Sequence, residues 1–321
     1  MFLTILLLVV GLAVLIFGGD IFIRGSASLA RKLNISPIVI GLTVVAFGTS
    51  VAELVVNILA ALKGASDLAI GNILGSNIAN VLLVLGVAAI IRKLTVKEGT
   101  AWKELPFCIL AVVLLFVMAN DVIFNGGSNL NILTRGDGLV LIGFFLIFLY
   151  YTYGLSKAEG EKSDVKVYTW LLSIVFVLVG IGSIILGAKL MVDNGVILAR
   201  IIGISDLFIG LTVVAIGTSL PELTTSIIAA YRGHDDLVIG NIVGSNIFNV
   251  LWVLGLTPVV SPIKINTDAN IDMLIAIISV VMLFAFMFIG HKHHRYTLRR
   301  WQGLFFIGMY IAYMVYVFYR G

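Results

Sequence analysis

The chain consists of long apolar runs separated by short polar segments. Ten such runs are found, near residues 1–18, 37–62, 69–91, 104–120 and 138–155 in the first half, and near 168–190, 207–231, 237–260, 271–290 and 300–319 in the second. A helix of roughly 20 apolar residues is long enough to cross the hydrocarbon core of a bilayer. The pattern therefore predicts an all-α membrane protein with ten transmembrane helices.

Residues 41–86 and 210–255 are two copies of one pattern. The copies align without a gap at an offset of 169 residues, and 31 of their 46 positions are identical. Weaker matches continue toward both ends of each half. Identity at this level indicates an internal duplication. We therefore expect two five-helix repeats, residues 1–155 and 168–321, joined by a polar cytoplasmic linker at residues 156–167.

An odd number of helices in each repeat has a geometric consequence. Two five-helix units joined by a short linker must lie in the membrane with opposite orientations. Inverted repeats around a site near the midplane are a recurring plan for secondary transporters. The chain is therefore predicted to consist of two inverted five-helix repeats.

Composition and charge place the chain in a membrane and orient it. Apolar residues make up 60% of the sequence and charged residues 12%, with a mean hydropathy of +1.12, which excludes a soluble domain. Of the 21 Lys and Arg residues, 15 lie in loops that follow odd-numbered runs. Because such basic loops stay in the cytoplasm, we expect a multi-pass protein of the plasma membrane with both termini extracellular.

Several other classes of protein are disfavoured by the sequence. The first run, MFLTILLLVVGLAVLIF, lacks a basic region and a cleavage pattern, so it is expected to be retained as the first helix. The single cysteine, Cys108, excludes an internal disulfide. No nucleic-acid motif is present, and the histidines of residues 291–294 are expected to be solvated. No histidine lies in an apolar run to activate Ser50 or Ser219, so we expect no enzymatic activity.

Each copy of the duplicated pattern has one carboxylate inside an apolar run, Glu53 in the first and Glu222 in the second. A carboxylate at membrane depth is costly and usually faces a site or a pathway rather than lipid. Thr49 and Thr218 precede the two acids by four residues and therefore share their helix faces. The duplication suggests that both acids contribute to one site between the two halves.

Neutral oxygen donors follow on the next apolar run of each copy. They recur at every fourth residue, as Asn72, Ser76 and Asn80, and as Asn241, Ser245 and Asn249. Two glutamates match the charge of one Ca²⁺, and neutral oxygens help to fill its six to eight ligand positions. The alternative is that these side chains only cross-link helices. The same runs contain G-x-x-x-G pairs, Gly71–Gly75 and Gly240–Gly244, which favour close helix approach.

A break in the helix is predicted shortly before each acid. Gly48 and Gly217 weaken the helix, and Pro221 cannot donate a hydrogen bond to the carbonyl of Gly217. A broken helix leaves carbonyl oxygens free, and these suit hard cations such as Na⁺ and Ca²⁺. Ala52 stands where the second copy has Pro221, so the first break rests on Gly48 alone. The alternative is a kink that only serves packing.

The duplicated motifs carry a family resemblance. GTSVAEL followed by GNILGSNIANVLLVLG, and GTSLPEL followed by GNIVGSNIFNVLWVLG, closely resemble the α-repeats of the cation/Ca²⁺ exchanger superfamily, the sodium/calcium exchangers. The resemblance extends over all ten runs. The absence of a large domain between the fifth and sixth runs is similar to the prokaryotic members.

The resemblance implies a set of ligands. A Ca²⁺ site would be built by Glu53 and Glu222 with the backbone carbonyls of Thr49 and Thr218, and Asn80 and Asn249 would border it. Flanking Na⁺ sites would use the carbonyls of Ala46 and Ala215 and the hydroxyls of Ser50, Ser219, Ser76 and Ser245. The first and sixth helices would slide past a fixed core. Two positions depart from the family pattern: Asn249, where some members have Asp, and Ala52, where Pro is usual.

These observations favour a secondary antiporter that exchanges Na⁺ for Ca²⁺ by alternating access. No cofactor is expected, and the partners are Ca²⁺, Na⁺ and the lipid bilayer, with H⁺ as a further candidate ion. We expect a functional monomer. Exchange of Ca²⁺ for H⁺, or exchange that depends on K⁺, is the alternative within transport. A passive cation channel is disfavoured because carboxylates close the duplicated site.

Overall fold

The structure, a computed structural model, describes residues 2–124, 130–156, 167–201, 217, 219–289 and 296–320. Most of these residues are helical, as the apolar runs predict. Eight helices in the described part are long and apolar enough to cross a membrane, and a bent pair, Pro37–Val51 and Glu53–Leu62, makes a ninth span. The run at 207–231 is described only from residue 217 onward, without residue 218. The predicted count of ten is therefore not confirmed in full.

The described elements follow the predicted runs. The first half contains α1 (Phe2–Leu33), α2 (Pro37–Ile40), the π-helical turn η1 (Gly41–Val45), α3 (Ala46–Leu62), α4 (Ser66–Ala79), the π-helical turn η2 (Asn80–Val84), α5 (Leu85–Ile91), β1 (Leu94–Thr95), α6 (Glu98–Trp102), α7 (Glu104–Met118), α8 (Asp121–Phe124), β2 (Asn131–Leu133) and α9 (Arg135–Ser156). The second half contains α10 (Trp170–Ile201), α13 (Leu220–Tyr231), α14 (Asp235–Ile247), the π-helical turn η4 (Phe248–Val253), α15 (Leu254–Val260), β3 (Ile263–Ile265), α16 (Ala269–Phe286), β4 (Thr297–Leu298) and α17 (Arg300–Arg320). The four short strands were not predicted.

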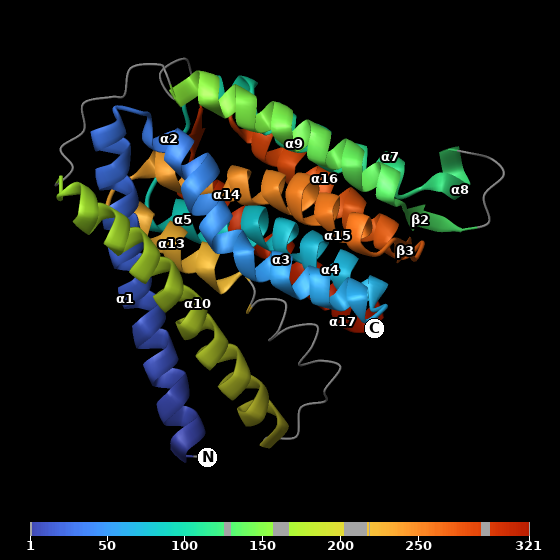
Figure 1. Cartoon of the computed structure of the whole chain (residues 1–321), viewed down its shortest axis with the longest axis horizontal. Helices are drawn as coiled ribbons and strands as arrows, with labels where there is room; N and C mark the ends of the chain where they lie inside the picture. Colours follow the sequence, from blue (N-terminus) through green and yellow to red (C-terminus); the bar gives the residue numbers. More distant parts are fainter. Residues whose placement is uncertain are drawn as a thin grey trace.

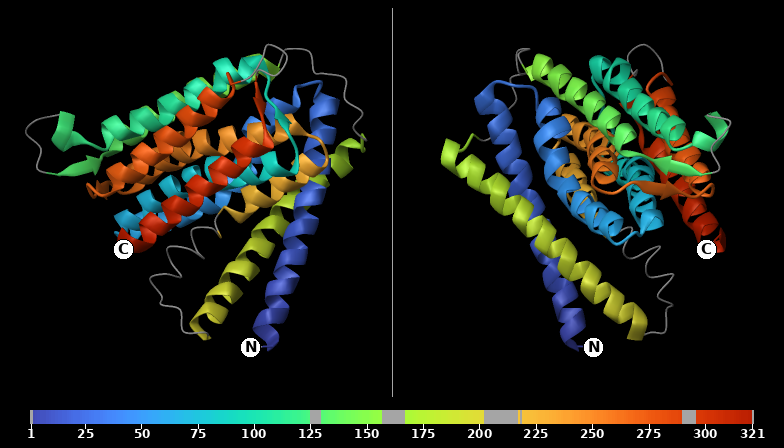
Figure 2. Two further views of the ribbon diagram at one scale, coloured as in Figure 1. Left: turned by 180° about the vertical axis from the view of Figure 1, so that it is seen from behind. Right: turned by 45° about the vertical axis from the view of Figure 1, so that its right-hand side comes forward.

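Helices α1 and α10 lie side by side and lean away from the other helices, which form a bundle (Figures 1 and 2). Glycines allow their close crossing. A Cβ on Gly180 would lie 2.7 Å from the Cα of Phe22, and one on Gly187 would lie 2.6 Å from the backbone nitrogen of Leu15. The hydroxyls of Ser28 and Ser173 also form a hydrogen bond of 2.8 Å across this pair.

The centre of the bundle is formed by the helices that carry the polar stripes. Within an 18-residue apolar stretch of each span, 94% of the residues are buried in Asp235–Val260 and 78% in Ser66–Ile91, whereas the share does not exceed 44% in the other six single spans. The stripe residues are thereby removed from lipid. A Cβ on Gly240 would meet the Cα of Gly41 at 2.8 Å, so the second G-x-x-x-G pair does bring two helices close together. No described atom lies within 4 Å of a Cβ built on Gly71 or Gly75.

Two short ladders at the ends of the spans follow the duplication. Strand β1 pairs with β4, with Leu94 opposite Leu298, and β2 pairs with β3, with Leu133 opposite Ile263. Leu94 and Ile263 occupy equivalent positions of the two repeats, as do Leu133 and Leu298. Replacing each residue of the pair Leu94–Leu298 by its equivalent in the other repeat gives the pair Ile263–Leu133. The two ladders are therefore equivalent to each other, which is the relation expected for two inverted repeats.

The polar contacts between loops also respect the predicted sides. Lys97, after the third run, forms an ion pair of 2.9 Å with Asp236, after the seventh, and donates to the hydroxyl of Ser36, after the first, at 3.2 Å. On the other side, the amide of Lys264 donates to the hydroxyl of Ser66 at 3.3 Å. Each of these contacts joins loops of the same predicted side of the membrane.

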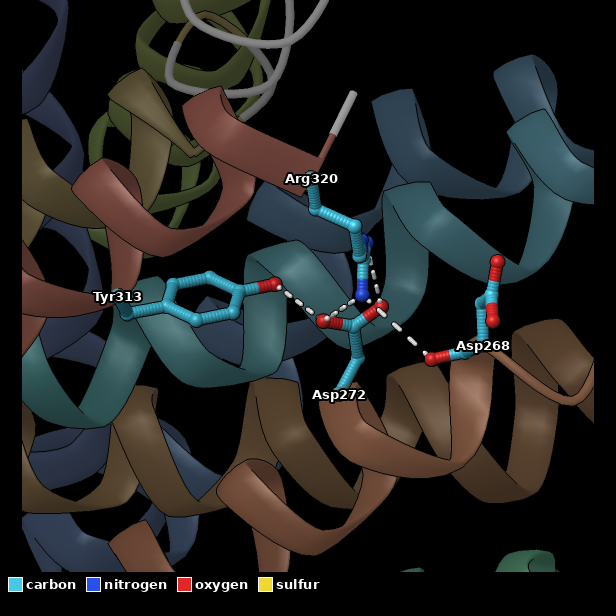
Figure 3. Close-up of polar contacts among 4 residues, drawn as sticks. All are labelled: Asp268, Asp272, Tyr313 and Arg320. Atoms are coloured by element: carbon cyan, nitrogen blue, oxygen red, sulfur yellow. Dashed lines mark hydrogen bonds and ion pairs between the residues drawn. The ribbon is translucent and has the colours of Figure 1, made fainter.

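A buried carboxylate outside the duplicated motifs is fully paired. Asp272, in the first turn of α16, accepts hydrogen bonds from both terminal nitrogens of Arg320 at 3.1 and 3.0 Å and from the hydroxyl of Tyr313 at 3.1 Å (Figure 3). Arg320 also donates to the backbone carbonyl of Asp268 at 3.4 Å. Because both carboxylate oxygens have partners, this cluster ties α16 to α17 and leaves no free ligand.

Candidate cation site

The two acids lie at different irregularities of their helices, Glu222 in the first turn of α13 and Glu53 directly after a bend within α3. Helix α13 starts at Leu220, with Pro221 in its first turn, so Glu222 lies at a helix N-terminus as the sequence predicts. In the first copy the axis bends by 46° between Val51 and Glu53, although no proline is present there. The N-terminal end of a helix favours negative charge, which suits the carboxylate of Glu222 in the first turn of α13.

Gly48 does not mark the break in the first copy. Helix α3 runs through it, and a Cβ at this residue would meet the side chain of Ile181 on α10 at 2.9 Å. The role of this glycine is close approach to the α1–α10 pair. The prediction that the break rests on Gly48 is therefore corrected, because the bend lies after Val51.

Glu53 and Glu222 converge inside the bundle. Each is fully buried, and the two carboxylates are close enough for their charges to repel each other. Glu222 also lies beside the hydroxyls of Thr49, Ser50 and Ser245, of which the first two come from the other copy of the motif. Two buried like charges without a cationic side chain need a cation or protons to compensate them.

The polar atoms around the two acids lack partners in the described part of the protein. Thirteen buried side-chain nitrogen or oxygen atoms there have no hydrogen bond, and nine of them belong to the predicted site. The nine are both carboxylate oxygens of Glu53 and of Glu222, the hydroxyls of Ser50, Ser76 and Ser219, and the Oδ1 atoms of Asn80 and Asn249. Buried polar atoms are normally hydrogen-bonded, so unpartnered oxygens gathered on these motifs indicate a site for a ligand. The set is suited to a hard cation.

Other predicted ligands have partners within the protein. The hydroxyl of Thr49 lies 3.2 Å from that of Ser245 and 3.3 Å from the carbonyl oxygen of Ala46, both buried. The contact between Thr49 and Ser245 joins the first copy of the motif to the second. Thr218 and Ala215 lie outside the described residues, so their predicted carbonyl ligands are not located.

The alternative interpretation, cross-linking of helices, is sufficient for the first asparagine of each polar stripe, which has no atom among the unpartnered ones. Asn72 donates to the side-chain oxygen of Asn57 at 2.8 Å. Asn241 donates to the hydroxyls of Thr225 and Ser226 at 3.0 Å each. Both therefore connect neighbouring helices, whereas Asn80, Asn249 and Ser76 keep unpartnered oxygens.

The site asparagines lie in π-helical turns. Asn80 begins η2, and Asn249 is the second residue of η4. The backbone amides of Leu85 and Leu254 donate to the backbone carbonyls of Asn80 and Asn249, each five residues earlier. Such π-helical insertions occur preferentially at functional sites. Here η2 packs against α13 and η4 against α3, so each asparagine lies on an element that contacts the helix of the opposite acid.

Some buried polar residues were missed by the sequence analysis. Asn77 and Asn246 are each 1% exposed and contact one another, yet no role was predicted for them. The sequence feature that could have revealed them is that both copies of the motif have Asn at this position. Glu104 and Asp272 are further buried carboxylates, and Glu104 accepts a hydrogen bond from Tyr151. Among the described residues, no three His, Cys, Asp or Glu side chains come together. Most ligands of an ion here must therefore be neutral.

Comparison with known proteins identifies the family. The family model described as "Sodium/calcium exchanger protein" matches residues 3–154 and 172–319, which is most of the chain. The chain belongs to the sodium/calcium exchanger family. It is thus a multi-pass membrane protein of a family of ion antiporters and not an enzyme. Cation/Ca²⁺ exchange is the activity class of the family.

Relatives of the chain lie within the same family of exchangers. It is 40% identical to the putative antiporter CaxA of Alkalimonas amylolytica over 84% of both chains. It is 31% identical to the sodium/calcium exchanger MaX1 of Methanosarcina acetivorans over 98% of both chains. Among solved structures, the sodium-calcium exchanger NCX_Mj superposes with a TM-score of 0.83 over 98% of both chains, at 33% identity.

Proposed function

We propose that this exchanger moves Ca²⁺ in one direction and Na⁺ in the other by alternating access, with Ca²⁺ bound at mid-membrane between Glu53 and Glu222. The observation that carries the proposal is the set of nine buried, unpartnered oxygens on the duplicated motifs. Two carboxylates match the charge of Ca²⁺, and the neutral oxygens complete its coordination. The name of MaX1 as a sodium/calcium exchanger supports the choice of ions.

The ligands divide between a central position and flanking positions. In the centre, Ca²⁺ is held by the two glutamates and the backbone carbonyls of Thr49 and Thr218, and Asn80 and Asn249 border it. The flanking Na⁺ ions use the carbonyls of Ala46 and Ala215 and the hydroxyls of Ser50, Ser219, Ser76 and Ser245. Full burial of the described ligands supports dehydration of the ions on binding.

Coupling of the two ion fluxes follows from the cost of an uncompensated site. Two carboxylates without a cation at membrane depth are strongly disfavoured. The carrier therefore changes sides only when one divalent ion or several monovalent ions neutralise Glu53 and Glu222. Because the same oxygens serve both ions, Ca²⁺ and Na⁺ compete, and the movement of one drives the other.

The moving part is the α1–α10 pair, which leans away from the bundle (Figure 1). It corresponds to the first and sixth helices of the two inverted repeats, residues 1–155 and 168–321, with a linker at 156–167. The site lies between this pair and the buried helices. Both termini are extracellular, the membrane is the plasma membrane, and the exchanger works as a monomer.

Ca²⁺ flux in proteoliposomes tests the proposal. The wild-type chain is expected to take up ⁴⁵Ca²⁺ when an outward Na⁺ gradient is imposed at fixed pH, and not without it. Glu222→Gln is expected to abolish this uptake. Glu104→Gln is the matched control, because it alters a buried carboxylate that is not part of the site.

The same assay separates the alternatives. Uptake that needs a pH gradient rather than Na⁺ would show exchange of Ca²⁺ for H⁺. Uptake that requires no counter-ion and does not saturate would show a channel. Wild-type uptake by Glu222→Gln would refute the shared site itself.

A further inference from the structure

We propose that Asn77 and Asn246 are positioning residues: they form a reciprocal clasp that turns the side-chain oxygens of Asn249 and Asn80 toward the transported cation. The inference rests on the proposed function, because it concerns how ligands of that same site are oriented. Neither Asn77 nor Asn246 is itself among the proposed ligands. Both are almost completely buried and occupy equivalent positions, 169 residues apart.

The first step fixes the orientation of the clasp itself. The side-chain amide nitrogen of Asn77 donates to the backbone carbonyl of Asn246 at 3.3 Å. Asn246 returns the same contact to the backbone carbonyl of Asn77 at 3.3 Å. A backbone carbonyl can only accept, so each side chain must direct its NH₂ group toward the partner's backbone. The Oδ1 atom of each must then point elsewhere.

The second step transfers this orientation to the site. Asn80 donates through its side-chain nitrogen to the Oδ1 of Asn246 at 3.0 Å. Asn249 donates in the same way to the Oδ1 of Asn77 at 3.1 Å. Because the Oδ1 of an asparagine can only accept, the NH₂ groups of Asn80 and Asn249 must face the clasp. Their own Oδ1 atoms face away from it and are two of the nine unpartnered oxygens.

The consequence is electrostatic. An asparagine side chain is nearly symmetric in shape, and a half-turn would exchange its oxygen for an NH₂ group. An oxygen attracts a cation, whereas the N–H hydrogens repel it. The clasp thus decides which end of each amide meets the ion. Groups that orient the ligands of a metal in this way affect its affinity by about 10- to 100-fold when they are removed.

A second asparagine pair in the protein provides the control. Asn120 and Asn270 exchange side-chain hydrogen bonds of 2.8 and 2.7 Å between the end of α7 and the start of α16. Asn120 is fully buried, but neither residue contacts the duplicated motifs through a described hydrogen bond. Asn120→Ala therefore removes a comparable buried amide pair without releasing a proposed ligand.

The first measurement is Na⁺-driven ⁴⁵Ca²⁺ uptake by the full chain in proteoliposomes. Asn77→Ala and Asn246→Ala are each expected to raise the apparent KM for Ca²⁺ by about tenfold, with maximal velocity little changed. Asn120→Ala is expected to leave KM unchanged. A loss of maximal velocity or thermal stability without a change in KM would show a merely structural role and overturn the inference.

The decisive measurement asks whether an Asp substitution at Asn80 or at Asn249 cancels the rise in KM that the loss of its own clasp partner causes. A carboxylate presents oxygen at both ends, so its orientation no longer matters. In an Asn80→Asp background, Asn246→Ala is expected to leave KM unchanged, whereas Asn77→Ala still raises it. In an Asn249→Asp background, Asn77→Ala is expected to leave KM unchanged, whereas Asn246→Ala still raises it. Comparing each variant within its own background removes the effect of the added charge.

Two results distinguish failure of this inference from failure of the proposed function. If both clasp variants raise KM equally in every background, the clasp does not act through Asn80 and Asn249, and the inference is wrong. If Glu53→Gln and Glu222→Gln transport like the wild type, the site itself is wrong, and the inference falls with it.

Discussion

At the scale of single residues, the buried polar side chains of the duplicated motifs include the carboxylates of Glu53 and Glu222 and the amides of several asparagines. A carboxylate inside an apolar run is rare enough to indicate a site by itself. An asparagine in the same run fits either a ligand or a cross-link. The NH₂ groups of Asn72 and Asn80 both donate to another side chain, but the oxygen of Asn80 is among the unpartnered buried atoms, whereas no atom of Asn72 is. That distinction depends on which atoms face one another, which no residue spacing records.

The two acids are expected to act as one unit. Because the proposed site shares one Ca²⁺ between them, Glu53→Gln or Glu222→Gln alone removes the charge balance that the ion needs. The double variant is therefore expected to bind Ca²⁺ no more weakly than either single variant. Calorimetric titration of purified protein with Ca²⁺ measures this, with Glu104→Gln as control. Losses that add up independently would indicate two separate sites.

At the scale of elements, helix positions were predicted better than helix lengths and local geometry. The first run was expected to end at residue 18, but α1 continues to Leu33. The polar residues Asp20 and Arg24 resemble a loop in sequence, yet they form an ion pair of 2.8 Å one turn apart on the helix. The π-helical turns were not predicted, since one extra residue per turn barely changes the hydrophobic pattern. The bend before Glu53 was predicted at Gly48, but it lies after Val51.

The crossing of α1 and α10 depends on glycines at particular positions. Gly180→Ala would put a methyl group 2.7 Å from the Cα of Phe22, so we expect a loss of about 1–3 kcal/mol in stability. Gly182→Ala is the matched control on the same helix, because no described atom lies within 4 Å of its Cβ. Alanine there is expected to stabilise slightly. Thermal unfolding in detergent compares the two, and equal effects would show that the crossing does not need Gly180.

An ion pair fastens α1 to α13 in this conformation. Arg232 donates through Nε to Asp20 at 2.8 Å. The equivalent residues of the repeats, Lys63 and Lys189, carry like charges, so no matching pair can form when the carrier closes on its other side. Asp20→Asn is expected to shift the balance between the two sides by up to about fivefold, since a part-exposed pair contributes about 1 kcal/mol at most.

The ratio of apparent Ca²⁺ affinities measured from the two sides of oriented vesicles reports this shift. An unchanged ratio in Asp20→Asn would show that the ion pair does not bias the carrier.

At the scale of the whole molecule, the duplication could be read from the sequence, but the shape could not. Each ladder is the equivalent of the other when the two repeats are superposed, which agrees with inverted repeats. The inversion itself follows from the odd number of spans in each repeat. Of the eight single spans in the described part of the chain, α1 and α10 contain the two most apolar windows, with mean hydropathies of 2.8 and 2.5. Hydropathy alone does not predict that these two helices lean away from the bundle (Figure 2).

The predicted orientation is open to a labelling test. The sole native cysteine, Cys108, is buried, so an introduced cysteine gives a clean signal. Thr267 and Lys93 are exposed in loops that follow even- and odd-numbered spans respectively. In intact cells, a membrane-impermeant thiol reagent is expected to label Thr267→Cys and not Lys93→Cys. Labelling in the reverse pattern would place the termini in the cytoplasm.

The location of bound Ca²⁺ tests the account most directly. Anomalous scattering from a crystal of this chain grown with Ca²⁺ and without Na⁺ would show where the ion sits. We predict one strong peak within about 2.3–2.6 Å of carboxylate oxygens from both Glu53 and Glu222. A peak that contacts only one of the two acids, or that lies elsewhere in the protein, would contradict the shared site.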